Sequence, residues 1–179
     1  MTIGTRFTPL YFILALLGAC QASHSALEPK PQEVGGMQNA ALTGDLLIGG
    51  QPTEEALEYL AREGYRDVVS VRSEGEVDWD EESRVEALGM SFHRIEMSNP
   101  VNEITDDEVA AFAQFMDERD GPALLHCGSG NRAAGLWAVW LIEHEEIDPA
   151  DAIRLATSAG MRESMKAVVE RRVSENAKR

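Results

Sequence analysis

The feature that most constrains this chain is the stretch over residues 123–135, which reads ALLHCGSGNRAAG. Its apolar run stops at His126 and Cys127, small residues follow, and an apolar helical pattern begins after Arg132. A strand, a glycine-rich turn and a helix start, in that order, direct backbone N–H groups and the positive end of a helix at one spot. The sequence therefore predicts an anion-binding loop with the Cys127 sulfur inside it.

The rest of the chain alternates between strand-like and helix-like segments. Strands are predicted over residues 45–48, 68–71, 90–97 and 122–126. Helices are predicted to begin near residues 54, 81, 106, 132, 149 and 162. This alternation is typical of an α/β domain with a mostly parallel sheet of about four to five strands flanked by helices. We expect a single domain over residues 39–179.

The N-terminal residues resemble an export signal. Arg6 precedes a short apolar core over residues 10–19, which is too short to span a bilayer comfortably. Because LGAC at residues 17–20 resembles a bacterial lipobox, we expect residues 1–19 to be a signal peptide of the lipoprotein type. Cys20 would then be the lipidated first residue, with an ordinary cleaved signal peptide as the alternative.

The residues that follow Cys20 are small and polar, with several prolines and glycines, so we expect a flexible tether over residues 20–38. Gln21 is not the aspartate associated with inner-membrane retention. We therefore expect an outer-membrane lipoprotein facing the periplasm, in contact with the membrane only through its lipid anchor.

The net charge of −15 argues against two classes of partner. A strongly acidic surface repels nucleic acid and anionic membranes, so we expect neither as a partner. The two cysteines are Cys20, which export explains, and Cys127, which then has no partner for a disulfide. A buried, inert thiol is one interpretation of Cys127. Its position between His126 and a glycine-rich turn favours a reactive thiol.

A reactive Cys127 needs a cation nearby. Lowering a thiol pKa by two units requires about 2.7 kcal/mol, whereas a helix N-terminus contributes at most about 2 kcal/mol. Arg132 closes the same turn and is suited to supply the remainder and to grip an oxyanion. The four histidines and Cys127 show no metal-ligand spacing, so we expect no metal and no other cofactor.

The segment HCGSGNRA resembles the active-site loop of the protein tyrosine and dual-specificity phosphatase superfamily. The chain is most similar to the bacterial phosphatase-like domain named after beta-lactamase hydrolase-like proteins. That family shares DLLIGGQP at residues 45–52, VVSVRSEGE at residues 68–76 and ITDDE at residues 104–108. The resemblance covers roughly residues 42–143 and implies a dual-specificity-phosphatase-like fold.

The resemblance also implies roles for the loop residues. Cys127 would be the nucleophile, Arg132 the anion-binding arginine, and His126 a residue that orders the loop and favours the thiolate. The amides that surround the bound anion would come from Gly128, Ser129, Gly130 and Asn131. The substrate would be a small anionic or phosphorylated molecule.

Two departures from the family pattern keep a second chemistry open. Four residues separate Cys127 from Arg132, one fewer than in the phosphatase signature, and Ala133 replaces a hydroxyl residue. The shorter spacing is that of a rhodanese-type sulfurtransferase, which works through a cysteine persulfide. Against this alternative, Gly128 stands where a rhodanese often has a basic residue.

The general acid is the other open point, because a phosphoester leaving group benefits from protonation as it departs. The region where the superfamily carries its acid offers Asn99 and Glu103, and Asp78 or Asp80 in the acidic loop could substitute. Three functions remain: a cysteine-dependent phosphatase-like hydrolase, a sulfurtransferase, and a non-catalytic module that binds an anion or a partner. We rank them in that order.

Overall fold

The computed structural model describes residues 25–97 and 103–178. The expected signal peptide, the lipidation site Cys20 and the first residues of the expected tether lie outside the described residues, as does Asn99.

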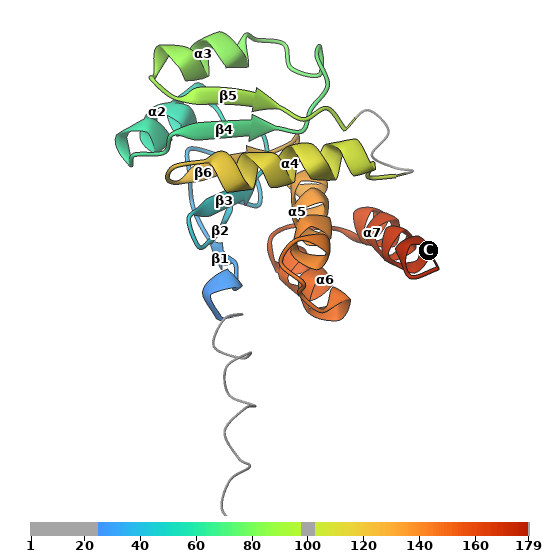
Figure 1. Ribbon diagram of the computed structural model, residues 1–179. Coiled ribbons are helices and arrows are strands. Elements are labelled where there is room, and N and C mark those ends of the chain that lie inside the picture. Colours follow the sequence, from blue (N-terminus) through green and yellow to red (C-terminus); the bar gives the residue numbers. More distant parts are fainter. Residues whose placement is uncertain (1–24, 98–102, 179) are drawn as a thin grey trace, which may run out of the picture.

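The described residues contain one six-stranded sheet, which confirms the predicted α/β class (Figure 1). Its strands are β1 (Lys30–Pro31), β2 (Ala41–Thr43), β3 (Leu46–Gly49), β4 (Asp67–Ser70), β5 (Ser91–Arg94) and β6 (Ala123–His126). They lie in the order β1-β2-β3-β6-β4-β5, and the last four are parallel to one another. The antiparallel strands β1 and β2 extend the sheet beyond the four strands that the pattern marked.

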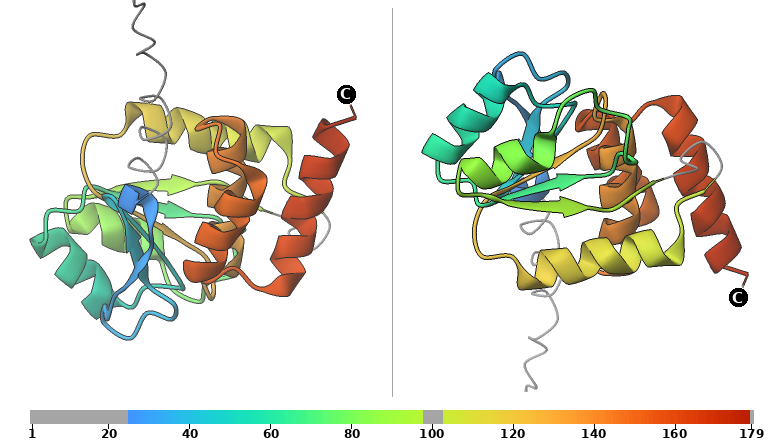
Figure 2. Two further views of the ribbon diagram at one scale, coloured as in Figure 1. Left: turned by 90° about the horizontal axis from the view of Figure 1, so that it is seen from below. Right: turned by 90° about the horizontal axis from the view of Figure 1, so that it is seen from above.

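Helices cover both faces of this sheet, and Figure 2 shows α2 and α3 on one face and α4 on the other. After a short 3-10 turn (Ser25–Leu27), the helices are α2 (Glu54–Arg62), α3 (Glu81–Ala87), α4 (Asp106–Glu118), α5 (Asn131–Glu143), α6 (Pro149–Ser158) and α7 (Glu163–Asn176). Successive strand residues point to opposite faces. Accordingly Leu124 packs with the α2 and α3 side chains, whereas Leu125 packs with those of α4 to α7.

Side-chain caps mark the predicted starts of α2 and α4. The Thr53 hydroxyl accepts a hydrogen bond from the Ala56 amide at the start of α2. At the start of α4, Thr105 and Glu108 bond each other's backbone amides, which completes the predicted capping box. These caps satisfy helix N–H groups that have no partner within the helix.

The expectation of a tether over residues 20–38 is wrong for residues 25–38. Val34 and Met37 are buried in the core, and β1 pairs with β2. The Gln32 amide also donates to the Ala40 carbonyl at 2.8 Å. The domain therefore begins well before residue 39. A two-residue strand and isolated apolar side chains produce no periodic pattern, so the sequence alone did not indicate this packing.

The contact between α5 and α7 offers a test of the packing. A Cβ added at Gly135 would lie 2.3 Å from Met165 Cγ, which is the inner part of a buried side chain. Gly135→Ala should therefore lower the free energy of unfolding by about 2 kcal/mol despite the better helix propensity of alanine. Urea denaturation measures this change. Combining it with Met165→Ala should recover part of the loss, and strictly additive losses would contradict this packing.

Candidate active site around Cys127

The Cys127 loop, residues 127–132, comprises the turn between β6 and α5 and the first two residues of α5, at the carboxyl edge of the parallel strands. Ligand sites of α/β sheets form at this edge. The segment after β3 braces the loop: the Cys127 amide donates to the Gly49 carbonyl, and the Gln51 amide to the Gly128 carbonyl, both at 3.3 Å. Gly130 has a φ of 87°, in the left-handed region that favours glycine, and caps α5.

The thiol lies inside this loop, where the sequence predicted it. Cys127 is only 1% exposed, and the Gly130 amide donates to its Sγ atom at 3.2 Å. Hydrogen bonding to Glu76 is the main cause that raises the pKa of Arg132, and the nearby Cys127 side chain raises it further. The structure thus brings together the sulfur, a loop amide and a fixed cation.

Arg132 is held by a carboxylate that the sequence analysis did not single out. Its Nη1 and Nη2 atoms donate to Glu76 Oε1 and Oε2 at 2.9 and 2.5 Å. Hydrogen bonding to Arg132 lowers the pKa of Glu76 to about 2, so this carboxylate is ionised at neutral pH. Glu76 therefore fixes the guanidinium plane and offsets its charge.

Arg72 lies at the same mouth and connects Glu76 to a second group of polar side chains. Its guanidinium donates to the Glu76 carbonyl and, at 2.6 Å, to Gln51 Oε1. The side-chain Nε2 atom of Gln51 in turn donates to Glu81 Oε1 at 2.6 Å. The only available sequence signal for Gln51 was its place in GGQP, directly after a strand that ends at the same sheet edge.

His126 and Glu81 form a buried pair next to Cys127. The exposed fractions are 0% for His126 and 4% for Glu81, and His126 Nε2 lies 3.3 Å from Glu81 Oε1. Burial lowers the pKa of His126 to about 3 and raises the pKa of Glu81 to about 7. The pair is therefore better described as a neutral imidazole beside a carboxyl that is largely protonated below neutral pH than as an ion pair.

Two of the predicted loop residues use their side chain or carbonyl to tie the loop to the rest of the domain. Asn131 Oδ1 accepts from the Arg162 amide at 2.7 Å, which attaches the start of α5 to the start of α7. The Ser129 carbonyl accepts from Asn39 Nδ2 at 2.8 Å. The Asn131 side chain thus serves to position the loop.

Within residues 25–97 and 103–178, none of the three acidic residues considered as general acids is hydrogen-bonded to Arg132 or to the Cys127 loop. Asp80 caps α3 by accepting from the Ser83 amide and hydroxyl, which lowers its pKa and makes it a poor proton donor. Asp78 is exposed, and Glu103 lines a cavity of about 220 Å³ beside α7. The structure instead places Glu76 and Glu81 in the network around the loop.

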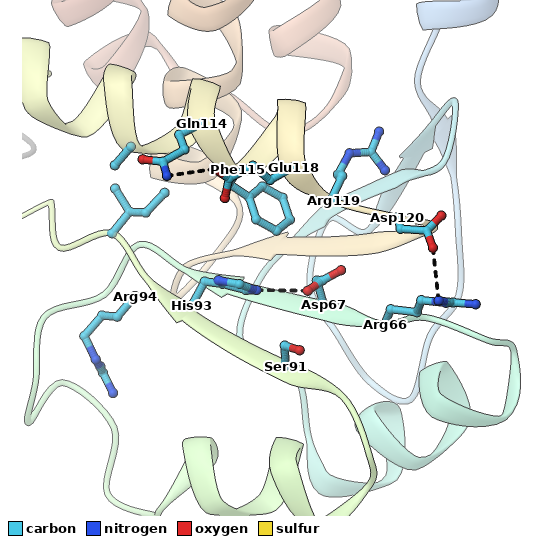
Figure 3. Close-up of a pocket in the computed structure, with 12 residues that line it drawn as sticks. Arg66, Asp67, Ser91, His93, Arg94, Gln114, Phe115, Glu118, Arg119 and Asp120 are labelled. Carbon is cyan, nitrogen blue, oxygen red and sulfur yellow. Dashed lines mark hydrogen bonds and ion pairs between the residues drawn. The ribbon is translucent and has the colours of Figure 1, made fainter.

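A separate cavity of about 560 Å³ lies between α4 and the strands β4 and β5. Figure 3 shows His93 bonded to Asp67 in it and Arg66 bonded to Asp120. Neither Cys127 nor Arg132 is among its lining residues.

Within residues 25–97 and 103–178, no group of three or more His, Cys, Asp or Glu side chains is arranged to hold a metal ion. In the same ranges no helix is long and apolar enough to cross a membrane.

Comparison with known proteins agrees with this geometry. A family model described as "DSP-PTPase phosphatase fused to NAD+ Kinase" matches residues 26–176. The beta-lactamase hydrolase-like protein of Agrobacterium fabrum is 32% identical over 108 residues, which are 58% of this chain and 25% of that protein. Its Xylella fastidiosa counterpart is 29% identical over 99 residues, 52% of this chain and 22% of the relative. The match thus spans about a quarter of the length of these curated relatives.

Solved structures share the fold. Pseudomonas aeruginosa TpbA, in complex with pTyr, has a TM-score of 0.65 and 19% identity, covering 81% of this chain and 90% of TpbA. A putative phosphatase of Shewanella putrefaciens has a TM-score of 0.62 and 18% identity, covering 78% and 94%. A putative phosphatase of Neisseria meningitidis has a TM-score of 0.60 and 23% identity, covering 71% and 92%.

Proposed function

Because this chain belongs to the family of DSP-PTPase phosphatases described as fused to NAD+ kinase, we propose that it is a cysteine-dependent phosphatase whose nucleophile is Cys127. The observation that carries this proposal is the meeting of the Cys127 sulfur, the Gly130 amide and the Arg132 guanidinium at the carboxyl edge of the sheet. An anionic nucleophile and donors for three phosphoryl oxygens are what phosphoryl transfer to a protein side chain requires.

In the proposed reaction, the Cys127 thiolate attacks phosphorus, an S–P bond forms and the ester P–O bond breaks. The leaving oxygen takes a proton and departs as an alcohol or phenol. Water then attacks the phosphocysteine, which releases inorganic phosphate and regenerates the thiolate. Arg132 and the loop amides hold the phosphoryl oxygens in both steps.

The substrate class that we propose is a small phosphoester with a good leaving group, such as an aryl phosphate. Two observations support it. Asp80 is bonded to Ser83 as the cap of α3, which lowers its pKa and makes it a poor proton donor, and phenols need less assistance in leaving than alkyl alcohols do. In addition, TpbA, which shares the fold, was solved with pTyr, an aryl phosphate.

A sulfurtransferase remains the second candidate, because four residues separate Cys127 from Arg132 as in a rhodanese-type loop. In that reaction the thiolate would take the outer sulfur of thiosulfate, releasing sulfite, and pass it to cyanide as thiocyanate. Sulfite is a stable anion and needs no acid to leave.

Assays of the purified protein with an aryl phosphate and with thiosulfate plus cyanide separate these proposals. We expect release of inorganic phosphate and no thiocyanate. Thiocyanate formation without phosphate release would replace the phosphatase proposal by the sulfurtransferase one. Turnover of neither substrate class would favour the module that binds an anion without catalysis.

A separate proposal concerns location, and it rests on the sequence of residues 1–20 alone. The apolar core and the LGAC segment support export, lipidation at Cys20 and attachment to the outer membrane on its periplasmic side. The phosphatase would then meet small phosphorylated molecules of that compartment, without a nucleic-acid partner and with no membrane contact beyond the lipid.

A further inference from the structure

The proposed chemistry uses the thiol, the loop amides and Arg132, and leaves one buried carboxyl without a role. Glu81 is the first residue of α3, and its side chain is 4% exposed. A carboxyl withdrawn from water costs several kcal/mol unless it is protonated or well bonded. The neighbours of Glu81 indicate a role for this buried carboxyl.

The polar and charged residues around Glu81 lie at or just after the ends of the four neighbouring parallel strands β3, β6, β4 and β5. Gln51 follows β3, Arg72 follows β4, Arg94 ends β5 and His126 ends β6. Gln51 donates to Glu81 at 2.6 Å, and His126 Nε2 lies 3.3 Å away. Arg72 and Arg94 act on Glu81 and on His126 through their charges, and Arg132 acts on His126.

The orientation of Gln51 follows from its two partners. Arg72 has only N–H donors, so the Gln51 oxygen must face Arg72, as it does at 2.6 Å. The Gln51 NH2 group therefore faces Glu81 and donates to Oε1. The bond to Gln51 fixes the Glu81 carboxyl beside the imidazole of His126.

The location of the proton follows from the charges. With Arg72, Arg94 and Arg132 all acting on it, an imidazolium at His126 would be repelled by three cations as well as desolvated. A neutral imidazole beside a protonated carboxyl avoids two buried charges. His126 Nε2 is buried without a hydrogen-bond partner among the described residues, and a protonated Glu81 carboxyl, 3.3 Å away, places a donor beside it.

We propose that Glu81, held by Gln51, is a positioning residue that orients His126 and thereby fixes the backbone of the Cys127 loop. This inference rests on the proposed phosphatase function for its catalytic consequence. The inference that Glu81 positions the loop does not depend on that function. His126 directly precedes Cys127 in the chain, so the orientation of its ring affects the loop whatever the substrate is.

The test compares Glu81→Gln and Glu81→Ala with the wild type and with Glu86→Gln, which changes an exposed carboxyl of the same helix. Glutamine has the shape of a protonated glutamate and keeps a donor, so Glu81→Gln at pH 6 should retain kcat for an aryl phosphate within about threefold. Alanine should lower kcat by about 10–100-fold, by analogy with residues that orient a metal-ligating histidine, with KM changed by less than about twofold.

The pH profile of Cys127 alkylation by iodoacetamide gives a readout that a purely structural role would not move. Because the pKa of Glu81 is raised to about 7, the wild type gains a negative charge beside His126 as the pH rises through that value. The extra charge lowers the reactivity of Cys127, so the alkylation rates of the wild type and of Glu86→Gln should show an additional step near pH 7. The Glu81→Gln profile should follow a single titration.

Two results would overturn the inference: a Glu81→Ala protein with the kcat and alkylation profile of the wild type, or a Glu81→Gln protein as impaired at pH 6 as Glu81→Ala. If the alanine variant does not fold, the glutamine variant and its alkylation profile still decide. If the wild type hydrolyses no aryl phosphate, the function proposal fails, whereas the alkylation profile still tests the role of Glu81.

Discussion

Replacing Cys127 with serine is expected to lower kcat/KM for an aryl phosphate by about 10⁴-fold or more, because a serine hydroxyl is a far weaker nucleophile at neutral pH than a cysteine thiolate. Serine is nearly isosteric, and its oxygen can still accept from the Gly130 amide, which bonds the sulfur at 3.2 Å. The folded structure should therefore change little. Initial rates of phosphate release, measured with a large excess of enzyme, give the residual activity.

The control for this variant is the affinity for inorganic phosphate, a product that binds the same loop. Phosphate should bind Cys127→Ser at least as well as the wild type, because a neutral hydroxyl removes the negative thiolate from the anion site. Isothermal titration measures that affinity. If Cys127→Ser kept more than a tenth of the wild-type activity, nucleophilic catalysis by Cys127 would be contradicted, even with phosphate binding unchanged.

The second large effect is expected at Arg132, where lysine should lower kcat/KM by roughly 10²–10³-fold. Lysine keeps the charge but not the planar fork, so it can bond neither the two Glu76 oxygens nor two phosphoryl oxygens in parallel. The loss should appear mainly in kcat, because the fork matches the transition state better than it matches the substrate.

The chain offers a matched control for this substitution. Arg119 also bonds a carboxylate, donating to Asp45 at 2.6 Å, and neither residue is part of the network around the Cys127 loop. Arg119→Lys should therefore leave kcat/KM unchanged within about twofold while altering the same kind of bond. If Arg119→Lys and Arg132→Lys lowered activity equally, the effect would be one of folding and not of phosphoryl binding.

The Glu76 carboxylate competes with a bound anion for the Arg132 guanidinium. Because its pKa is about 2, Glu76 remains paired with Arg132 throughout the range in which the protein is assayed. The contribution of this pair to stability is present above the ordinary glutamate pKa near 4.5 and is lost only as the pH falls toward 2. A bound phosphate must share the guanidinium with Glu76 or displace it.

Several features could be predicted because they depend on residues close together in sequence. The capping box needs only Thr105 and Glu108, three positions apart, and the Cys127 loop is a strand end, a glycine turn and a helix start in one run of 13 residues. The alternation of strands and helices likewise follows from local hydrophobic periodicity. These short-range features led to the correct fold class and marked the Cys127 loop, whose catalytic role stays a prediction.

Other features depend on which strands become neighbours. Glu76 bonds Arg132 across 56 positions and Gln51 bonds Glu81 across 30. These contacts exist because β6 lies between β3 and β4, so that the segments after all three strands converge at one edge. Local periodicity contains no information on strand order, and a polar residue in a loop has the same pattern whether it is solvated or buried.

The sequence by itself thus determined the α/β class, the helix starts and the loop that carries Cys127 and Arg132, since local propensity and spacing encode them. Tertiary structure alone decided that residues 25–38 belong to the domain, that Asp80 is a helix cap, and that Glu76 holds Arg132. It also decided that Glu81 lies beside His126. The physical reason is that burial and partner choice, which set the charge of a carboxyl, arise only when distant segments pack together.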